Sequence, residues 1–209
     1  MLTTMPTTET STEKSTLLFG GSFDPVHRGH EYILEKALEK TDYERIVVMP
    51  AYLSNFKQDS RPACAADRLN MLHLAFDGLD TGGRELVIST YEIDRGGVSY
   101  SYDTVMAMYG LYAIRGRLGF LMGDDLVSGL ERWYRWNDLR DIVDFVVFTR
   151  DASHISAPPG ARLSLIQVAP FHASSSEVRA GALDELVPSV KNYVIEHGLY
   201  DTGENRKGE

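Results

Sequence analysis

His27 and His30 are the residues whose types and spacing first suggest chemistry in this sequence. They lie three positions apart in the segment GGSFDPVHRGH, which begins at Gly20 and follows the apolar run Thr16–Phe19. At the start of a helix, this spacing lets two imidazoles direct N–H donors the same way. The two glycines permit a tight turn and a close backbone approach, and a helix N-terminus attracts anions. The segment therefore predicts a phosphate-binding loop.

The histidine pair has two other interpretations. One histidine can cap the helix while the other is half-buried, which is the ordinary outcome for an isolated His-x-x-His. A transition-metal site is the second interpretation, but a catalytic zinc takes three protein ligands and no third His or Cys lies nearby. The neighbouring glycines, the strand before and the helix after favour phosphate binding, and we expect no metal held by the protein.

A second group of donors lies near the C-terminus, in the segment SSSEVR. Ser174, Ser175 and Ser176 precede a predicted helix, where hydroxyl and backbone N–H groups can donate to phosphate oxygens, and Arg179 adds a permanent cation. The same pattern is typical of a capping box, with serine as the N-cap and Glu177 in the first turn. Both interpretations can hold together.

Apolar runs of strand length alternate with segments of helical period between the two ends of the chain. The strand candidates are Thr16–Phe19, Arg45–Met49, Glu85–Ile88, Leu118–Met122, Phe145–Phe148 and Leu163–Val168. The helix candidates are Glu31–Lys40, Asp67–Phe76, Tyr102–Tyr112 and Val187–Glu196. Apolar strands followed by amphipathic helices predict an α/β fold whose parallel sheet is covered on both faces. In such folds ligands bind beyond the carboxyl ends of the strands.

Composition limits the class of protein further. The 209 residues carry 43% hydrophobic and 24% charged residues and a net charge of -9, which suits one globular domain, here residues 16–200, between flexible tails 1–15 and 201–209. The acidic balance argues against a nucleic-acid partner. The longest apolar stretch, Val105–Ile114, is about half the length of a membrane span, so no membrane partner is expected. Cys64 is the only cysteine, and no presequence pattern is present; both favour a cytoplasmic protein.

The ordered motifs of the chain resemble those of one family. GGSFDPVHRGH resembles the opening motif of the His-x-Gly-His nucleotidyltransferase superfamily, and specifically of the bacterial nicotinate mononucleotide adenylyltransferases. The resemblance extends over residues 16–200 and rests on further segments: RLNMLHLA at 68–75, SYSYDT at 99–104, Gly123 and Asp125 followed by Trp133-Tyr134, SSSEVR at 174–179 and HGLY at 197–200.

This resemblance implies a Rossmann-like, doubly wound, mostly parallel sheet and an adenylyl transfer reaction. The 5′-phosphate of nicotinate mononucleotide would attack the α-phosphorus of ATP in line, giving deamido-NAD and pyrophosphate in NAD biosynthesis, with Mg²⁺ accompanying ATP. A phosphate monoester is mostly dianionic at pH 7, since its second pKa is about 6, so no general base is required. The implied partners are ATP and a pyridine mononucleotide, and a homo-oligomer is left open.

The resemblance also implies a role for individual residues. His27, His30 and Arg179 would contact the ATP phosphates during the reaction. The remaining ATP-binding residues would be Gly20, Gly21, Ser22, Phe23, Lys57, Ser174, Ser175 and Ser176. The mononucleotide would contact Tyr100, Ser101, Asp125, Trp133 and Arg150. For Trp133 the alternative is aromatic packing, and for Arg150 it is an ordinary surface position.

The sequence departs from the family pattern at several positions. Where the family commonly shows Pro-Pro-His-Lys, the chain has LSNFK at 53–57, so only Lys57 matches, and Ser101 and Ser176 stand where threonine is usual. These changes affect the choice of acceptor more than the reaction type. The alternatives are therefore the same chemistry on nicotinamide mononucleotide or phosphopantetheine, or a module that senses a nucleotide without turnover.

Overall fold

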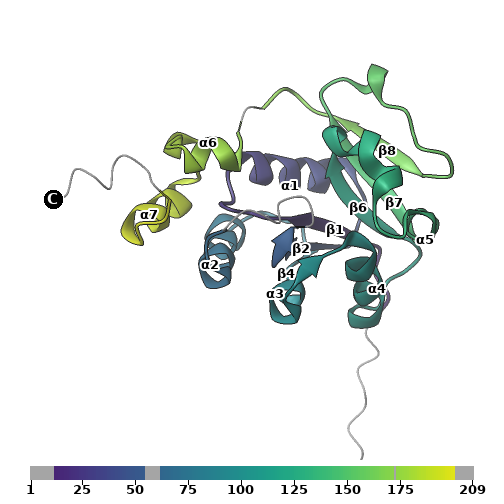
Figure 1. The fold of residues 1–209 in the computed structure, drawn as a ribbon, viewed down its shortest axis with the longest axis horizontal. Helices are drawn as coiled ribbons and strands as arrows, with labels where there is room; N and C mark the ends of the chain where they lie inside the picture. The colour runs from purple at the N-terminus through teal and green to yellow at the C-terminus, as the bar shows by residue number, and fades with distance from the viewer. Residues whose placement is uncertain (1–11, 55–61, 172, 201–209) are drawn as a thin grey trace, which may run out of the picture.

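A six-stranded parallel sheet forms the centre of the computed structural model, which describes residues 12–54, 62–171 and 173–200 (Figure 1). The strand order is β4-β2-β1-β6-β7-β8. The strands are β1 (Thr16–Gly21), β2 (Arg45–Pro50), β4 (Glu85–Ile88), β6 (Leu118–Gly123), β7 (Val143–Thr149) and β8 (Leu163–Gln167). Every neighbouring pair is parallel. Numbered within this sheet alone, the order is 3-2-1-4-5-6, which is that of a Rossmann fold and confirms the predicted fold.

Helices cover both faces of the sheet because successive strand residues point to opposite sides. Leu17 and Phe19 of β1 pack with α1, α2 and α7, whereas Leu18 packs with α4 and α5 on the other face. In Figure 1, α1 and α4 accordingly lie on opposite sides of the sheet. The α-helices are α1 (Arg28–Lys40), α2 (Ala65–Phe76), α3 (Tyr91–Arg95), α4 (Ser101–Leu111), α5 (Trp136–Ile142), α6 (Ser175–Arg179) and α7 (Pro188–Glu196). No helix in the described ranges is long and apolar enough to cross a membrane.

All six predicted strands and all four predicted helices are present, with ends shifted by a few residues. Sequence reasoning missed the short elements. These are a parallel pair of two-residue strands, β3 (Leu53–Ser54) and β5 (Val98–Ser99), the helices α3 and α5, and three 3-10 helices: η1 (Asp124–Arg132), η2 (Ala152–His154) and η3 (Leu183–Glu185). Apart from η1, these elements have seven residues or fewer and span less than two turns of a helix, so periodicity could not identify them.

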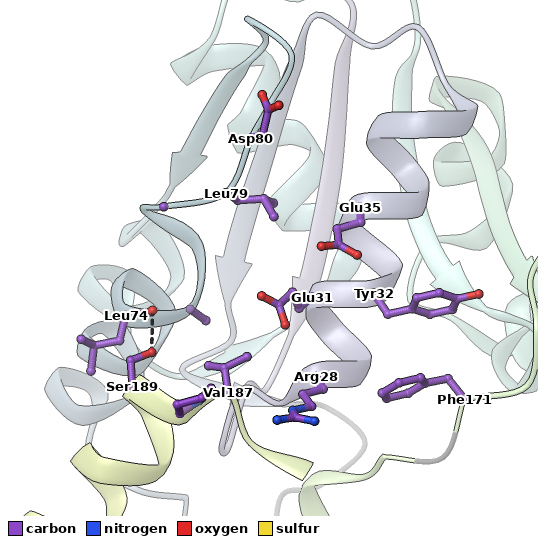
Figure 2. A pocket seen from close by; sticks show the side chains of 13 residues that line it. Arg28, Glu31, Tyr32, Glu35, Leu74, Leu79, Asp80, Phe171, Val187 and Ser189 are labelled. Atoms are coloured by element: carbon purple, nitrogen blue, oxygen red, sulfur yellow. Dashed lines mark hydrogen bonds between the residues drawn. The ribbon is translucent and has the colours of Figure 1, made fainter. Parts of the chain in front are cut away.

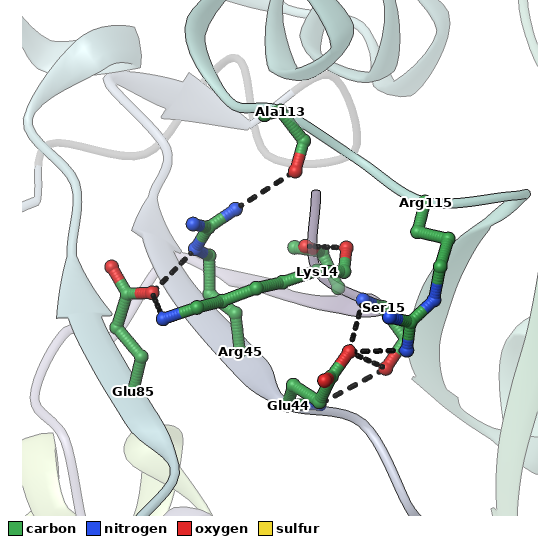
Figure 3. Close-up of polar contacts among 8 residues, drawn as sticks. Lys14, Ser15, Glu44, Arg45, Glu85, Ala113 and Arg115 are labelled. Carbon is green, nitrogen blue, oxygen red and sulfur yellow. Dashed lines mark hydrogen bonds and ion pairs between the residues drawn. The ribbon is translucent and has the colours of Figure 1, made fainter. Parts of the chain in front are cut away.

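Ion pairs lie where the strands of the sheet begin, which is the amino-terminal edge of the sheet (Figure 3). Glu85 Oε2 accepts from Lys14 Nζ at 2.8 Å and from Arg45 Nε at 2.9 Å. Glu44 pairs with Arg115 and also accepts from the backbone N–H of Ser15 at 2.9 Å. Lys14 and Ser15 fall within the predicted N-terminal tail, and this network holds them against the starts of β1, β2 and β4.

Candidate active site

The loop after β1 turns sharply around the side chain of Phe23. Phe23 has a left-handed backbone conformation, with φ of 46°, and its ring is buried beneath the loop. A Cβ at Gly21 would lie 3.0 Å from Cζ of this ring, so the turn leaves little room for any side chain at that position. The ring also lies 4.9 Å from that of His30, centroid to centroid. Phe23 therefore supports the loop and one imidazole from below.

His27 and His30 form a reciprocal cap at the start of α1. Nδ1 of His27 accepts the backbone N–H of Gly29 at 3.1 Å, and Nδ1 of His30 accepts the backbone N–H of His27 at 3.2 Å. The two ring planes are tilted by 35°, with their centroids 3.8 Å apart. When Nδ1 accepts, a neutral imidazole carries its proton on Nε2, at the opposite side of the ring. The capping interpretation is thus correct, and in this tautomer the proton of each ring is on Nε2.

Burial keeps His27 neutral. Only 8% of the residue is exposed, and desolvation lowers its pKa from 6.5 to about 4, although the charge of Glu177 acts in the opposite direction. The ring is therefore uncharged near neutral pH, so Nδ1 can accept the backbone N–H of Gly29 while Nε2 carries the proton.

Gly29, the glycine of His-x-Gly-His, lies where the structure leaves no room for a side chain. A Cβ at Gly29 would lie 2.9 Å from both Cε1 and Nδ1 of His27, closer than real Cβ contacts allow. The imidazole lies over the bare Cα of Gly29, which is how its Nδ1 reaches that residue's N–H. The glycine of the motif is therefore needed for the position of the His27 ring, in addition to the two histidines themselves.

Helix α6 attaches to the loop after β1 through its serines and its arginine. Ser174 is the N-cap and accepts from the backbone N–H of Glu177 at 3.1 Å, as the capping interpretation predicts. Ser175 donates to the carbonyl of Pro25 at 3.0 Å. Arg179 donates from Nη2 to Ser176 Oγ at 3.1 Å and from Nη1 to the carbonyl of Asp24 at 2.6 Å. Segments more than 140 residues apart in the chain, the two predicted donor groups, are thus brought together.

Two buried charged residues at this site were missed by sequence reasoning. Arg68 of α2 is 2% exposed and donates to four carbonyls, at Ser22, Ala51, Tyr52 and Ala63. It thereby ties the loops after β1 and β2 to the start of α2. Asp24 is 6% exposed and accepts hydrogen bonds from Ala63 and Tyr200. The one available signal was a charged residue on an otherwise apolar helix stripe at Arg68.

The predicted acceptor side lies at the ends of β6 and β7, beside β1. The register pairs Phe19 with Leu121, so the loops after β1 and β6 leave the sheet next to each other. A Cβ at Gly123 would lie 2.5 Å from Oδ1 of Asp125, so the Gly-x-Asp spacing lets the Asp125 carboxylate fold back over the strand end. Arg150 follows β7 directly and is exposed at the same edge.

Aromatic side chains join the start of α4 to the η1–α5 connection. Trp133 is half-buried, and the centroid of its ring lies 5.6 Å from that of Phe120. The exposed Tyr134 has its ring centroid 5.1 Å from that of Tyr100. Tyr100 is the N-cap of α4 and makes no side-chain cap, and Ser101 is the first helical residue. Tyr100 and Ser101 at the start of α4 therefore lie near Trp133 in the η1–α5 connection. Asp125 follows the end of β6, and Arg150 follows β7.

Other predicted positions contribute less. Gly20 is exposed at the end of β1, with no atom within 4 Å of a built Cβ. Lys57 lies outside the described residues. Within the described ranges, no group of three or more His, Cys, Asp or Glu is placed to hold a metal ion.

A cavity of about 640 Å³ lies elsewhere, along the outer face of α1 (Figure 2). It is bounded by α1, the end of α2 and the start of α7, and its lining includes the carboxylates of Glu31, Glu35 and Asp80. Burial and the charge of Glu35 raise the pKa of Glu31. Three carboxylates against the single cation Arg28 repel phosphate groups, so this cavity is a poor site for ATP.

Comparisons with known proteins show which family the chain is similar to. A family model described as cytidylyltransferase-like matches residues 18–181. The nicotinate-nucleotide adenylyltransferase of Bacillus subtilis (strain 168) is 32% identical over 191 residues, covering 88% of this chain and 97% of the relative. Solved structures of Plasmodium falciparum nicotinic acid mononucleotide adenylyltransferase, complexed with NaAD or with APC, superpose with a TM-score of 0.71 at 21% identity, covering 90% of this chain and 98% of theirs.

Proposed function

Because the chain belongs to the cytidylyltransferase-like family and, within it, to the nicotinate-nucleotide adenylyltransferases, we propose that it transfers the adenylyl group of ATP to nicotinate mononucleotide. The products are deamido-NAD and pyrophosphate. The observation that carries this proposal is the pair of neutral imidazoles at the N-terminus of α1, with Arg179 held against the same loop.

His27 and His30 act as hydrogen-bond donors to phosphate oxygens. Their Nδ1 atoms accept backbone N–H groups, so the proton of each ring is assigned to Nε2, and we propose that these N–H groups donate to the ligand. During in-line attack, charge builds on the α-phosphoryl oxygens and on the departing pyrophosphate. Preorganised donors aimed at that charge lower the barrier, and removing one typically costs about 10²-fold in rate. The attacking phosphate is already dianionic, so neither ring needs to accept a proton.

Arg179 supplies the permanent charge. A guanidinium carries five N–H donors, and the two hydrogen bonds to Asp24 and Ser176 use only two of them. The remaining donors can bind the triphosphate while the arginine stays anchored. The loop residues Gly20, Gly21, Ser22 and Phe23 and the start of α6 at Ser174–Ser176 complete this side. Lys57 is proposed to bind ATP as well.

The mononucleotide is proposed to occupy the edge beyond β6 and β7. The Asp125 carboxylate would accept from ribose hydroxyls, and the half-buried face of Trp133 would stack on the pyridine ring. Backbone N–H groups at Tyr100 and Ser101, where the N-cap side chain offers no acceptor, would receive the nicotinate carboxylate. Arg150 would face the mononucleotide phosphate.

The divalent cation expected for this reaction is Mg²⁺ bound to the ATP phosphates, where it neutralises charge on the leaving pyrophosphate. Mg²⁺ in such sites is held mainly by substrate phosphates and water with one or two carboxylates.

The test is incubation with ATP, Mg²⁺ and each candidate acceptor, with pyrophosphate and the dinucleotide measured together. We expect stoichiometric pyrophosphate and deamido-NAD with nicotinate mononucleotide. Faster turnover with nicotinamide mononucleotide or phosphopantetheine would reassign the acceptor, and ATP binding without pyrophosphate release would indicate a sensing module.

The acceptor side has its own test. We expect Trp133→Ala to raise the KM for the mononucleotide about tenfold and that for ATP much less, because base-like rings stacked on aromatic side chains contribute roughly 1 to 3 kcal/mol. Equal changes in both constants would instead indicate a purely structural tryptophan.

A further inference from the structure

Asp24 is the point where four separate parts of the chain meet beside the phosphate loop. Its Oδ1 accepts from the backbone N–H of Ala63 at 3.0 Å and from the phenol of Tyr200 at 2.8 Å. On its other side, Oδ2 lies 3.8 Å from Nη1 of Arg179, and that nitrogen also donates to the Asp24 carbonyl. The carboxylate is therefore fixed on one side by α2's leading segment and the C-terminal segment, and faces Arg179 on the other.

Tyr200 reaches this carboxylate from the residues that follow α7. It has a left-handed backbone conformation, with φ of 64°, and its ring packs at the edge of the core formed by α1, α2 and α7. Burial, followed by the charge of Asp24, raises the pKa of the phenol, so the hydroxyl stays protonated and acts as a donor. Tyr200 is separated from Asp24 by 176 positions, so this contact forms only when the C-terminal segment is docked.

We propose that Asp24 and Tyr200 are positioning residues for adenylyl transfer, in which the Tyr200 phenol holds the Asp24 carboxylate so that it orients Arg179 toward the triphosphate. This inference rests on the proposed function. It assigns to the C-terminal segment a part in ATP binding, although Tyr200 itself does not contact the reacting atoms.

The geometry explains why a positioning role needs both groups. Arg179 is about one-third exposed, and its two hydrogen bonds to protein leave other donors available, so its direction depends on what surrounds Nη1. A carboxylate free to rotate could accept a bidentate pair from Arg179 and withdraw it from a ligand. With Oδ1 occupied by Ala63 and Tyr200, Oδ2 can attract Nη1 but cannot easily form that closed pair.

A second tyrosine provides a matched control. Tyr193 of α7 donates from its phenol to Oδ1 of Asp67 at 2.8 Å, the same bond type and length as Tyr200 to Asp24. That contact links α7 to α2 and does not touch the loop after β1. Tyr193→Phe and Tyr200→Phe thus remove one hydroxyl each from the same side of the molecule, and only the second should affect Arg179.

The experiment measures KM for ATP, kcat and thermal stability for both variants. We expect Tyr200→Phe to raise the KM for ATP about tenfold, in line with loss of one hydrogen bond to a charged acceptor, and to leave the KM for the mononucleotide within about twofold. Tyr193→Phe should match wild type in both constants while losing similar thermal stability. Identical kinetics for the two variants would overturn the proposal.

A double-mutant cycle with Arg179→Lys then identifies the route of the effect. If Tyr200 acts through Arg179, the effects of Tyr200→Phe and Arg179→Lys on ATP affinity should be strongly less than additive. Additive effects would overturn the positioning role. Asp24→Asn, which keeps an oxygen for Tyr200 but removes the charge facing Arg179, should reproduce the raised KM for ATP, and covers the case in which Tyr200→Phe fails to fold.

Failure of the two proposals is distinguishable. Calorimetric titration of each variant with Mg·ATP reports the positioning effect even if no dinucleotide is formed. Wild-type protein that binds Mg·ATP but releases no pyrophosphate would reject the proposed function alone. Turnover by wild type with unchanged ATP affinity in Tyr200→Phe would reject the positioning inference alone.

Discussion

The basic side chains at the two ends of the strands of the central sheet have different hydrogen-bond partners. At the amino-terminal edge, Lys14 and Arg45 share the carboxylate of Glu85, and Arg115 pairs with Glu44, so the charges are matched within the protein. At the carboxyl-terminal edge, Arg68 donates to four backbone carbonyls. Arg179 donates to a carbonyl and a hydroxyl, and its nearest carboxylate oxygen, on Asp24, lies 3.8 Å from Nη1.

The difference shows which edge is built for an anionic ligand. Around the phosphate loop, the guanidinium groups of Arg68 and Arg179 both interact with the carboxylate of Asp24. The imidazoles of His27 and His30 lie at the same place, and the carboxylates of Glu177 and Glu185 lie at the start of α6. Arg179 therefore keeps donors available where the loops meet, whereas the opposite edge has used its donors to hold Lys14 and Ser15. Changes at the first edge should alter turnover, and changes at the second should alter stability.

The largest effect should come from removing a donor at the carboxyl-terminal edge. We expect His30→Ala to lower kcat by about 10² or more, the usual loss for one preorganised transition-state donor. His73→Ala is the control, because that imidazole is exposed on α2 and contacts only Asp77. Pyrophosphate release measures both variants. Wild-type kcat in His30→Ala would remove the basis for assigning donors to this edge.

The buried neutral imidazole predicts a pH effect on stability. The pKa of His27 is about 4 in the folded chain and about 6.5 when unfolded, so the unfolded state binds a proton first as the pH falls. Stability is therefore lost between pH 6.5 and 4, by about 2 to 3 kcal/mol at pH 4.5. His27→Asn keeps a capping side chain without the titrating ring, and urea unfolding at pH 7.5 and 4.5 should show a smaller loss in this variant. Equal losses in both proteins would contradict a depressed pKa.

Two glycine substitutions separate ring placement from helix propensity. Gly29→Ala places a Cβ against the His27 ring and should lower kcat/KM about tenfold, since overpacking costs roughly 1 to 3 kcal/mol. Gly110→Ala, in the exposed part of α4 with no atom near its Cβ, should leave turnover unchanged and add about 0.5 to 1 kcal/mol of stability. Full activity in Gly29→Ala would show that the ring position is not required.

The smallest effect is expected at the amino-terminal edge. Glu85→Gln should lower the free energy of unfolding by about 1 kcal/mol at pH 7 and leave kcat unchanged, because the pair is partly exposed. Hydrogen bonds from Lys14 and Arg45 depress the pKa of Glu85, so the stabilising contribution is present above the unfolded pKa and disappears as the pH falls through the folded one. Urea unfolding should thus show wild type and variant converging in acid, and altered kcat would end the contrast between the edges.

Most of the fold followed from the sequence because parallel strands buried on both faces are continuously apolar. Thr16–Phe19, Phe145–Phe148 and the other runs have this character, and the helices between them are amphipathic. The connection from Asp124 to Ile142 could not be predicted, since its short turns of helix place Trp136 in the core and leave Tyr134 exposed without a sustained period.

The site divides in a similar way. His27, His30 and Arg179 were found because their side-chain types and local spacing indicate phosphate chemistry. Arg68, Asp24 and Tyr200 were not, because their partners are backbone carbonyls or residues far away in the chain, and such contacts leave no local pattern. The position of the His27 ring over Gly29 could not be predicted from the sequence for the same reason.

The most direct test of the donor-rich edge is the long-range ¹H–¹⁵N spectrum of the histidine rings at pH 7, recorded before and after addition of Mg·ATP. We predict neutral Nε2–H tautomers for His27 and His30 in the free protein, and shifts of both Nε2 resonances on binding while His73 is unchanged. Charged rings, Nδ1–H tautomers, or resonances of His27 and His30 that do not respond to Mg·ATP would contradict the account.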